Sequence, residues 1–433
     1  MSKIINSAHV EGLDPTFGSD KSGVSWLQYP VGTNGFVWGI TVAPDNKLLI
    51  AGRAGKRFSI VRLQTDGRQD PDFGDQGSVL GEFAVGDQST GRSARVLEDK
   101  TILLEGWFEY EPSSPALRGL ALFDDKGMPV KEFGTNGVKI VAPISTSGYR
   151  LSEEEIANKD PSTSPEGGYS IELPEGKLMI ISNHRYSFSN NIGLLIRLKK
   201  NGSLDIDFQE KGYVDVQYLA NHTTATSLIR LKDESFAVGG STVVNGKTMP
   251  MIARYNAQGK IIEEFGNEGF VVIETDQNIG STSQLIELPD GNILGIGSTS
   301  SHGTQSGLLF CIDNKGALVP SFNQGEPLIT AYPQAPMGIQ WHQGTLRQGK
   351  HIMVIANTLG EKDSKTIIAK FGLDGVQDIH FAEKGFLIIE LTDVLDSGVS
   401  IATQNDQIIG AGTSLPHADG VRAFAFRCSD RFK

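Results

Sequence analysis

The chain has 433 residues, of which 39% are hydrophobic, and a formal net charge of −12. An acidic chain with no basic run of five or more residues is a poor partner for nucleic acid or an anionic membrane, since both bind clustered Lys and Arg. No segment reaches the roughly 20 apolar residues of a membrane span, and the N-terminal residues do not form a standard signal peptide. We therefore expect a cytoplasmic protein, or one released without such a signal.

A short segment built around a phenylalanine recurs along the chain and sets its organisation. It first appears as LDPTFG at 13–18 and is clearest as DPDFGDQG at 70–77. The phenylalanines of its seven copies are Phe17, Phe73, Phe133, Phe208, Phe265, Phe322 and Phe381. Consecutive copies lie 56, 60, 75, 57, 57 and 59 residues apart, a period that indicates stacked or radially arrayed units. A unit of about 60 residues is too small to bury a core alone, so the units should pack together as one domain.

Each repeat carries the signals of two hairpins. In the first complete copy the four expected strands cover 39–43, 47–52, 58–63 and 78–83. Turns such as Asp66-Gly67 join them, because glycine supplies the positive φ that tight hairpin turns require. Four antiparallel strands, repeated seven times, predict an all-β fold, a seven-bladed β-propeller. Short, regularly spaced strands also occur in sandwiches, but the fixed period argues against one.

The two ends of the chain are out of register with the repeat. The chain begins with a Phe-Gly segment and a fourth strand at 24–29, and it ends just after a third strand at 422–427. We therefore expect the N-terminal strand to complete the last blade and close the ring, which removes exposed sheet edges. Residues 1–433 would then form a single domain, with a long loop insertion at 142–168.

Acidic and basic residues recur at fixed places in several copies. Three copies pair an aspartate three residues before the Phe with a base eight residues earlier: Arg62 and Asp70, Arg197 and Asp205, and Lys370 and Asp378. Asp14 has no preceding repeat, so its partner would be Arg427 if the two ends meet. We predict an Asp14–Arg427 ion pair. Repetition around a ring favours a structural brace over a ligand site for these pairs.

These motifs resemble those of a known repeat family. The third-strand segment IARYN at 252–256, the Phe-Gly segments at 13–18 and 70–77, and PDGNIL at 289–294 are similar to the delta-60 repeat. The resemblance covers nearly the whole chain, and the copies at 338–357 and 427–430 depart most from the pattern. It implies a β-propeller of the kind found in large bacterial proteins, with no shared catalytic residues to carry over.

One connection between repeats is much longer than the others. Residues 142–168 account for the spacing of 75 residues, and 151–159 within them are expected to form a short helix. Ser152 and Glu155 have the spacing of a capping box at its start. The segment is either an inert surface excursion or a flap over one side of the channel mouth.

Aromatic and basic residues lie in loops expected beside this insertion. Trp107 and Tyr110 belong to the loop between the second and third strands of one repeat, and His184, Arg185 and Tyr186 belong to the matching loop of the next. Exposed aromatic rings with an Arg and a His suit a sugar ring, a peptide or an anionic group. Alternatively, Trp107 and Tyr186 pack under the insertion without binding anything.

A second group of candidates lies in the sixth repeat. Trp341 and His342 open its inner strand and could reach the channel, although a lone histidine there is more often a satisfied polar residue. We expect neither metal nor cofactor, because the chain lacks paired-histidine zinc motifs, phosphate loops, dinucleotide fingerprints and CxxC motifs. Cys311 and Cys428 lie in repeats that should not touch, so a disulfide is not expected.

The sequence favours a binding or interaction propeller. Its ligand would be a carbohydrate, peptide or protein held on the loop face near 142–168. One alternative is a lyase, hydrolase or isomerase in the channel mouth, with His184 or His342 as the general base and Arg185 stabilising an anion. A carboxylate that converges with a base and a His or Tyr in one pocket would favour that alternative. Another is a structural subunit of a larger complex, which a flat apolar patch would favour.

Overall fold

The computed structural model describes residues 12–30, 34–86, 88–109, 116–141, 170–187, 190–360, 364–392, 394–415 and 420–429. These residues form an all-β structure in which 28 strands are described. Helical structure within these ranges is limited to short 3-10 turns such as η3 (Pro174–Gly176) and η4 (Asn323–Gly325). No helix in the described ranges has the length and apolar character needed to cross a bilayer.

The strands follow the repeats in groups of four. In the first half of the chain they are β1 (Val24–Trp26), β2 (Gly35–Val42), β3 (Leu48–Ala54), β4 (Arg57–Leu63), β5 (Ser78–Gly81), β6 (Gln88–Val96), β7 (Ile102–Glu109), β8 (Leu117–Phe123), β9 (Val138–Val141), β10 (Ser170–Leu173), β11 (Lys177–Ser187), β12 (Asn190–Leu198) and β13 (Tyr213–Val216). In the second half they are β14 (Thr223–Arg230), β15 (Phe236–Val244), β16 (Lys247–Tyr255), β17 (Phe270–Val272), β18 (Ile279–Glu287), β19 (Ile293–Ser301), β20 (Thr304–Ile312), β21 (Leu328–Thr330), β22 (Ile339–Arg347), β23 (His351–Thr358), β24 (Thr366–Gly372), β25 (Phe386–Ile389), β26 (Asp396–Gln404), β27 (Gln407–Ser414) and β28 (Arg422–Arg427).

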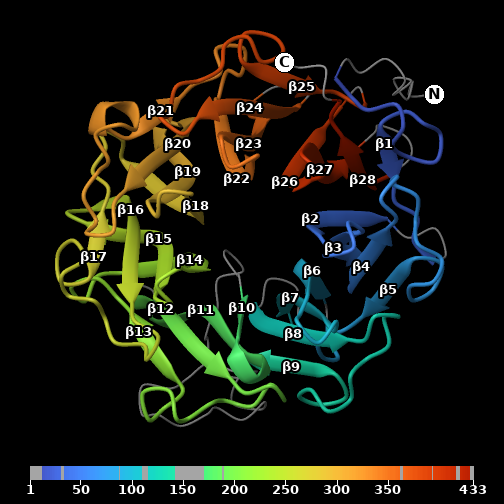
Figure 1. Cartoon of the computed structure of the whole chain (residues 1–433), viewed down its shortest axis with the longest axis horizontal. Helices are drawn as coiled ribbons and strands as arrows, with labels where there is room; N and C mark the ends of the chain where they lie inside the picture. Colours follow the sequence, from blue (N-terminus) through green and yellow to red (C-terminus); the bar gives the residue numbers. More distant parts are fainter. Residues whose placement is uncertain are drawn as a thin grey trace.

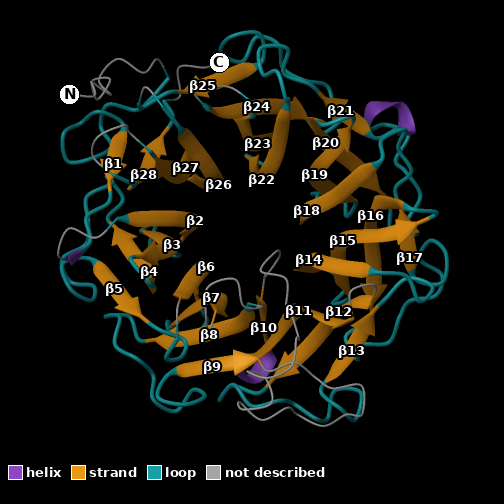
Figure 2. Cartoon of the chain, turned by 180° about the vertical axis from the view of Figure 1, so that it is seen from behind, coloured by secondary structure: helices purple, strands orange, loops and turns teal. Residues whose placement is uncertain are grey.

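Antiparallel pairing joins the strands into sheets that stand around a central axis (Figures 1 and 2). Strands β2–β5, β6–β9, β10–β13 and β22–β25 each form a four-stranded sheet in chain order. Strands β14–β17 and β18–β21 have the same internal pairing, and one parallel bridge between Thr248 and Ile279 links them into a larger sheet. The first strand of each group lies nearest the axis.

The N-terminal strand belongs to the same sheet as the C-terminal strands. The order of that sheet is β1-β28-β27-β26, with Val24 opposite Phe426 and Trp26 opposite Phe424. The expected pairing of β1 with the last third strand is confirmed. So is the predicted ion pair, because Arg427 Nε donates to Asp14 Oδ2 at 2.8 Å and both side chains are 11% exposed.

The Phe-Gly segment fastens each sheet to the next one. Phe73 is fully buried, and the N–H of Gly74 donates to the Lys126 carbonyl in the turn of the neighbouring sheet at 2.8 Å. Gly127 in that turn has φ +84, and a Cβ there would lie 3.1 Å from the Phe73 ring. The same bond runs from Gly18 to Asp66, from Gly134 to Asn201 and from Gly266 to Lys315. The Phe-Gly segment and the glycine turn are the two most regular sequence signals, and they form the two sides of one contact between neighbouring sheets.

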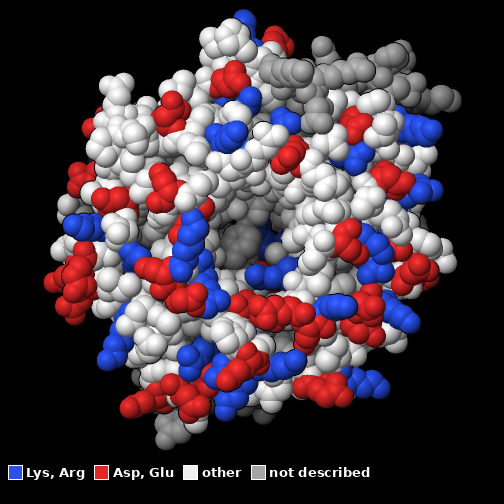
Figure 3. Space-filling model, viewed as in Figure 1, with Lys and Arg blue, Asp and Glu red and all other residues white. Residues whose placement is uncertain are grey.

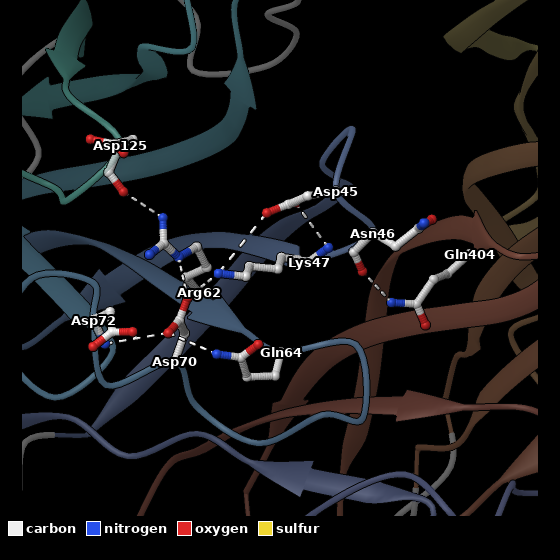
Figure 4. Close-up of polar contacts among 9 residues, drawn as sticks. All are labelled: Asp45, Asn46, Lys47, Arg62, Gln64, Asp70, Asp72, Asp125 and Gln404. Atoms are coloured by element: carbon white, nitrogen blue, oxygen red, sulfur yellow. Dashed lines mark hydrogen bonds and ion pairs between the residues drawn. The ribbon is translucent and has the colours of Figure 1, made fainter.

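The recurring Arg–Asp pairs support these contacts. Asp70 is fully buried and accepts from Arg62 Nε at 2.7 Å, Lys47 Nζ at 2.9 Å and Gln64 Nε2 at 2.8 Å (Figure 4). Arg62 Nη1 also donates to the Asp125 carbonyl of the next sheet at 2.5 Å. Burial alone would raise the pKa of Asp70, but these bonds and charges lower it overall. The geometry fits the structural brace expected from the repetition.

Candidate functional site

The strands nearest the axis share a local irregularity. Each of β2, β6, β14, β18, β22 and β26 has a β-bulge at the same register. A bulge leaves one residue out of the ladder and redirects its side chain, which is why bulges are common beside binding sites. The six residues left out of the ladder, called the axial residues here, are Trp38, Arg92, Thr226, Ser283, His342 and Val399.

Two of the axial residues are committed to neighbouring backbone. The Thr226 hydroxyl lies within hydrogen-bonding distance of the Gly239 and Thr282 carbonyls, and the Ser283 hydroxyl donates to the Trp341 carbonyl at 3.4 Å. Trp38, Arg92 and His342 are half-buried, so part of each side chain is accessible. The space-filling view is hollowed at the centre, and basic side chains are visible inside the hollow (Figure 3).

At four of the six bulges, the residue that follows the bulge bonds to the inner strand of a neighbouring sheet. These four side chains accept a backbone N–H from the neighbouring sheet, with the pairs Leu285 to Ser227 at 2.9 Å, Gly344 to Gln284 at 2.7 Å, Ile401 to Gln343 at 3.2 Å and Ile40 to Ser400 at 3.0 Å. The last pair joins β26 to β2, from opposite ends of the chain. Because the backbone is fixed from sheet to sheet, the axial side chains project from a rigid frame.

His342 is held as a neutral imidazole. Asn357 Nδ2 lies 2.9 Å from His342 Nε2 and donates to Ser397 Oγ at 2.8 Å. An amide nitrogen only donates, so Nε2 accepts and the ring proton is on Nδ1. Burial, with a smaller contribution from the charge of Arg92, lowers the pKa of His342 to about 4. The charge of Arg92 therefore reaches His342, although β6 and β22 belong to different, non-adjacent sheets.

Trp38 and Trp107 form an aromatic pair beside the axis. Their rings are 5.2 Å apart and meet edge to face at 74°. Trp107 is 8% exposed, so it supports Trp38 rather than presenting an open ring to a ligand. The expectation of an exposed indole at Trp107 is corrected in this respect.

A buried charged network lies between the second and third sheets. Glu105 is 2% exposed, accepts from the Ser170 N–H at 3.3 Å and lies 3.5 Å from Arg95 Nη2. Burial raises the pKa of Glu105 despite the neighbouring charges of Arg95 and Arg118. This carboxylate is therefore enclosed and used to join β6 and β7 to β10.

The structure places Trp341 away from the axis. Its side chain is fully buried in the core between the fifth and sixth repeats, where it meets Phe371 edge to face at 6.4 Å. A Cβ on Gly307 would lie 1.9 Å from the Trp341 indole nitrogen, so the glycine makes room for the ring. The expectation that Trp341 reaches the channel is not met, because its side chain is enclosed in this core.

The other predicted residues have different outcomes. His184 on β11 is 3% exposed, and burial lowers its pKa to about 4, so it is not placed as an accessible base. Arg185 and Tyr186 lie on the same strand, and the structure does not describe their side chains. Tyr110 and the insertion at 142–168, with its expected helix, lie outside the described residues.

Sequence reasoning missed Trp38 and Arg92. Neither belongs to a motif, and the signal that identifies them is comparative: aligning the inner strands by register puts six chemically different residues at one position. Among the described residues no cluster of His, Cys, Asp and Glu suited to a metal is found. Cys311 and Cys428 are both free and buried, as expected, and burial raises the pKa of each thiol to about 12.

His184 and His342 predict a loss of stability in mild acid. Both have pKa values of about 4 in the folded chain against an ordinary value of 6.5, so between these values the unfolded chain binds protons that the folded chain excludes. The free energy of unfolding should therefore fall as the pH is lowered from about 6.5 to 4. Urea denaturation across this range should show a shallower fall for His342→Gln than for the native chain. Identical pH dependence in the two proteins would contradict the assignment.

Comparison with known proteins supports the fold. The family described as "Domain of unknown function (DUF5122) beta-propeller" matches residues 43–73, which cover β3, β4 and the adjoining Phe-Gly segment. No curated protein matches the sequence.

Solved structures with similar architecture have diverse activities. An ulvan lyase bound to -[GlcA(1-4)Rha3S]- aligns over 92% of this chain and 98% of its own, with a TM-score of 0.50 and 11% identity. A catalytically inactive virginiamycin B lyase from Staphylococcus aureus with quinupristin covers 93% and 98%, with a TM-score of 0.48 and 12% identity. Extracellular domains of Drosophila Semaphorin 1a cover 93% and 88%, with a TM-score of 0.48 and 10% identity. At these identities the likeness concerns the fold alone. The chain has the fold of a β-propeller.

Proposed function

We propose that this chain is a closed seven-bladed propeller of the delta-60 repeat type, and that it binds a carbohydrate, peptide or protein segment at the mouth of its central axis. The observation that carries the proposal is the shared bulge of the inner strands. It gives Trp38, Arg92 and His342 the same position on the inner strands that surround the axis. An aromatic ring, a guanidinium and a neutral imidazole together offer stacking, charge and hydrogen bonding to one ligand.

Ring closure in this proposal is supported by packing at every junction. Seven core clusters each join two successive repeats, and one of them joins Ile50 and Val61 near the N-terminus to Ile409 and Ala425 near the C-terminus. A complete ring leaves the axis as the common meeting point of all the inner strands. Central openings of this kind are preferred ligand positions.

Binding is favoured over acid–base catalysis. A neutral His342 can accept a proton, but catalysis of this type also needs a placed general acid. The axial residues that the structure describes include no carboxylate, and Glu105 is enclosed by its own network. A lyase, hydrolase or isomerase is therefore the weaker proposal, and a purely structural subunit leaves the varied axial residues without a role.

The proposal is tested by binding to arrays of acidic and neutral oligosaccharides and of short peptides. The native chain should retain a defined subset of these probes. The double variant Arg92→Ala/His342→Gln should lose them by about tenfold or more, since both polar partners of the ligand are removed.

The matched control is Arg57→Ala, which removes an exposed arginine from the start of β4. It should bind the same probes as the native chain, and both variants should keep the native circular dichroism spectrum. Equal retention by the double variant and the native chain would reject an axial site.

A further inference from the structure

A second pocket lies on the outer rim, beside β1 rather than at the axis. Its volume is about 440 Å³, which falls within the range of small-molecule sites. It lies where the sheet containing β1 and β28 meets the turn that follows β4. Its lining residues are Ser19, Asp20, Val24, Ser25, Trp26, Gln28, Gly67, Arg68, Gln69 and Arg422.

Departures from the repeat converge on this pocket. The loop from Phe17 to Gly23 is two residues longer than the matching loop from Phe73 to Gly77, and it contributes Ser19 and Asp20. The fourth-strand position occupied by Trp26 holds Leu80, Ile140, Asp215, Val272, Ile329 or Ile388 in the other repeats. In a chain whose repeats supply the fold, an added loop and an unusual aromatic at one place indicate a local role.

Arg422 supplies a cation that the fold itself does not use. Its guanidinium lies 4.1 Å from the centre of the Trp26 ring, and Trp26 is in turn held edge to face by Phe424 at 6.0 Å. No carboxylate of the described residues forms an ion pair with Arg422. The other arginine of the pocket, Arg68, is already paired with Asp66 at 2.8 Å. A guanidinium backed by an indole keeps its N–H edge available for a carboxylate.

The remaining polar lining suits hydroxyl groups. Asp20 is exposed, and the bonds that the structure gives its carboxylate come from Ser22 to Oδ1, the backbone N–H at 3.1 Å and the hydroxyl at 2.6 Å. Gln69 is fixed between strands by accepting the Gln28 N–H at 2.6 Å and donating to the Gln28 carbonyl at 3.1 Å. The negative charge of Asp20 disfavours a polyanion, and its carboxylate oxygens accept hydrogen bonds from hydroxyl groups. A ligand with one negative group and several hydroxyl groups therefore suits the pocket.

We propose that the rim pocket binds a sugar that carries a single carboxylate, such as a hexuronate. The carboxylate meets Arg422 on its indole support, and the ring hydroxyls meet Asp20 and the serine side chains around it. This site is separate from the axial one and does not depend on it. A hexuronate is small enough for the volume of this pocket.

The test is a titration with D-galacturonate and, as its neutral match, D-galactose, followed by isothermal titration calorimetry. The native chain should bind galacturonate more tightly than galactose by about tenfold or more. Trp26→Leu, which installs the residue that the next repeat carries at Leu80, and Arg422→Ala should each lose that preference by a similar factor.

The repeat provides a matched control. Arg57 occupies the position of Arg422 on β4, five residues before Arg62 as Arg422 is before Arg427, and Arg57→Ala should bind galacturonate like the native chain. The inference is overturned if the native chain binds neither sugar, if it binds both equally, or if Trp26→Leu and Arg422→Ala bind galacturonate as well as Arg57→Ala. A stronger response to glycine or inorganic phosphate than to galacturonate would also overturn the assigned class. Failure of the axial site would leave these results unaffected.

Discussion

Replacing Asp14 with alanine is expected to lower the free energy of unfolding by about 3 to 5 kcal/mol, the range for breaking a buried ion pair by removing one partner. Arg427 would lose its 2.8 Å bond to the carboxylate while staying 11% exposed. Thr16, whose hydroxyl donates to Asp14 at 2.8 Å, would lose an acceptor as well. The bond joins residues from opposite ends of the chain, so its removal weakens the contact between the N-terminal and C-terminal segments. Urea denaturation measures the change.

Asp378→Ala is the matched control for this prediction. Asp378 occupies the same repeat position and binds Lys370 at 2.9 Å, but its side chain is 30% exposed and water can replace the lost partner. Its effect should be clearly smaller. If Asp14→Ala and Asp378→Ala cost the same, the brace between the chain ends contributes no special stability.

Replacing Phe73 with alanine is expected to cost about 3 to 5 kcal/mol, as found for large aromatic residues removed from well-packed cores. The ring is fully buried between two sheets and lies under Arg62, whose guanidinium is 4.5 Å from its centre. The cavity left behind would loosen the junction as well as remove buried apolar surface. Denaturation by urea, followed by tryptophan fluorescence and circular dichroism, measures the loss.

The same contact can be tested from its other side. Gly127→Ala should also destabilise the chain, because φ is +84 there and the new Cβ would lie 2.6 Å from Val79 Cγ2. Val85→Ala removes an apolar side chain that is 90% exposed and should have almost no effect. A Phe73→Ala protein as stable as Val85→Ala would show that the ring does not hold the sheets together.

The fold was predictable because short sequence motifs that specify local structure recur along the chain. The phenylalanine and the glycine turns recur because the junctions between sheets use the same buried ring and the same tight turn, and four of the seven copies add an acidic residue that pairs with a base. The Asp14–Arg427 pair could be predicted from the phase of the repeat alone. The structure contains this ion pair, so the position of each chain end within the repeat determines how the two ends pair.

The candidate site was harder to predict, because what distinguishes it is geometry. Trp341 is fully buried in the core, while the adjacent His342 is left out of the ladder by a bulge. The sequence pattern does not show where a bulge interrupts a strand. Trp38 and Arg92 can be recognised as candidate site residues only when the structure shows that inner strands far apart in the sequence surround one axis. Trp26 and Arg422 were missed for the same reason.

The pairing of β1 with β28 has a consequence for how the protein is made. β1 is synthesised long before β28, so during translation it has no partner until β26, β27 and β28 have emerged. Partial chains on the ribosome that lack β28 therefore leave an edge of β1 unpaired. Strains that slow late elongation should accumulate protease-sensitive nascent chains even when every earlier sheet has formed.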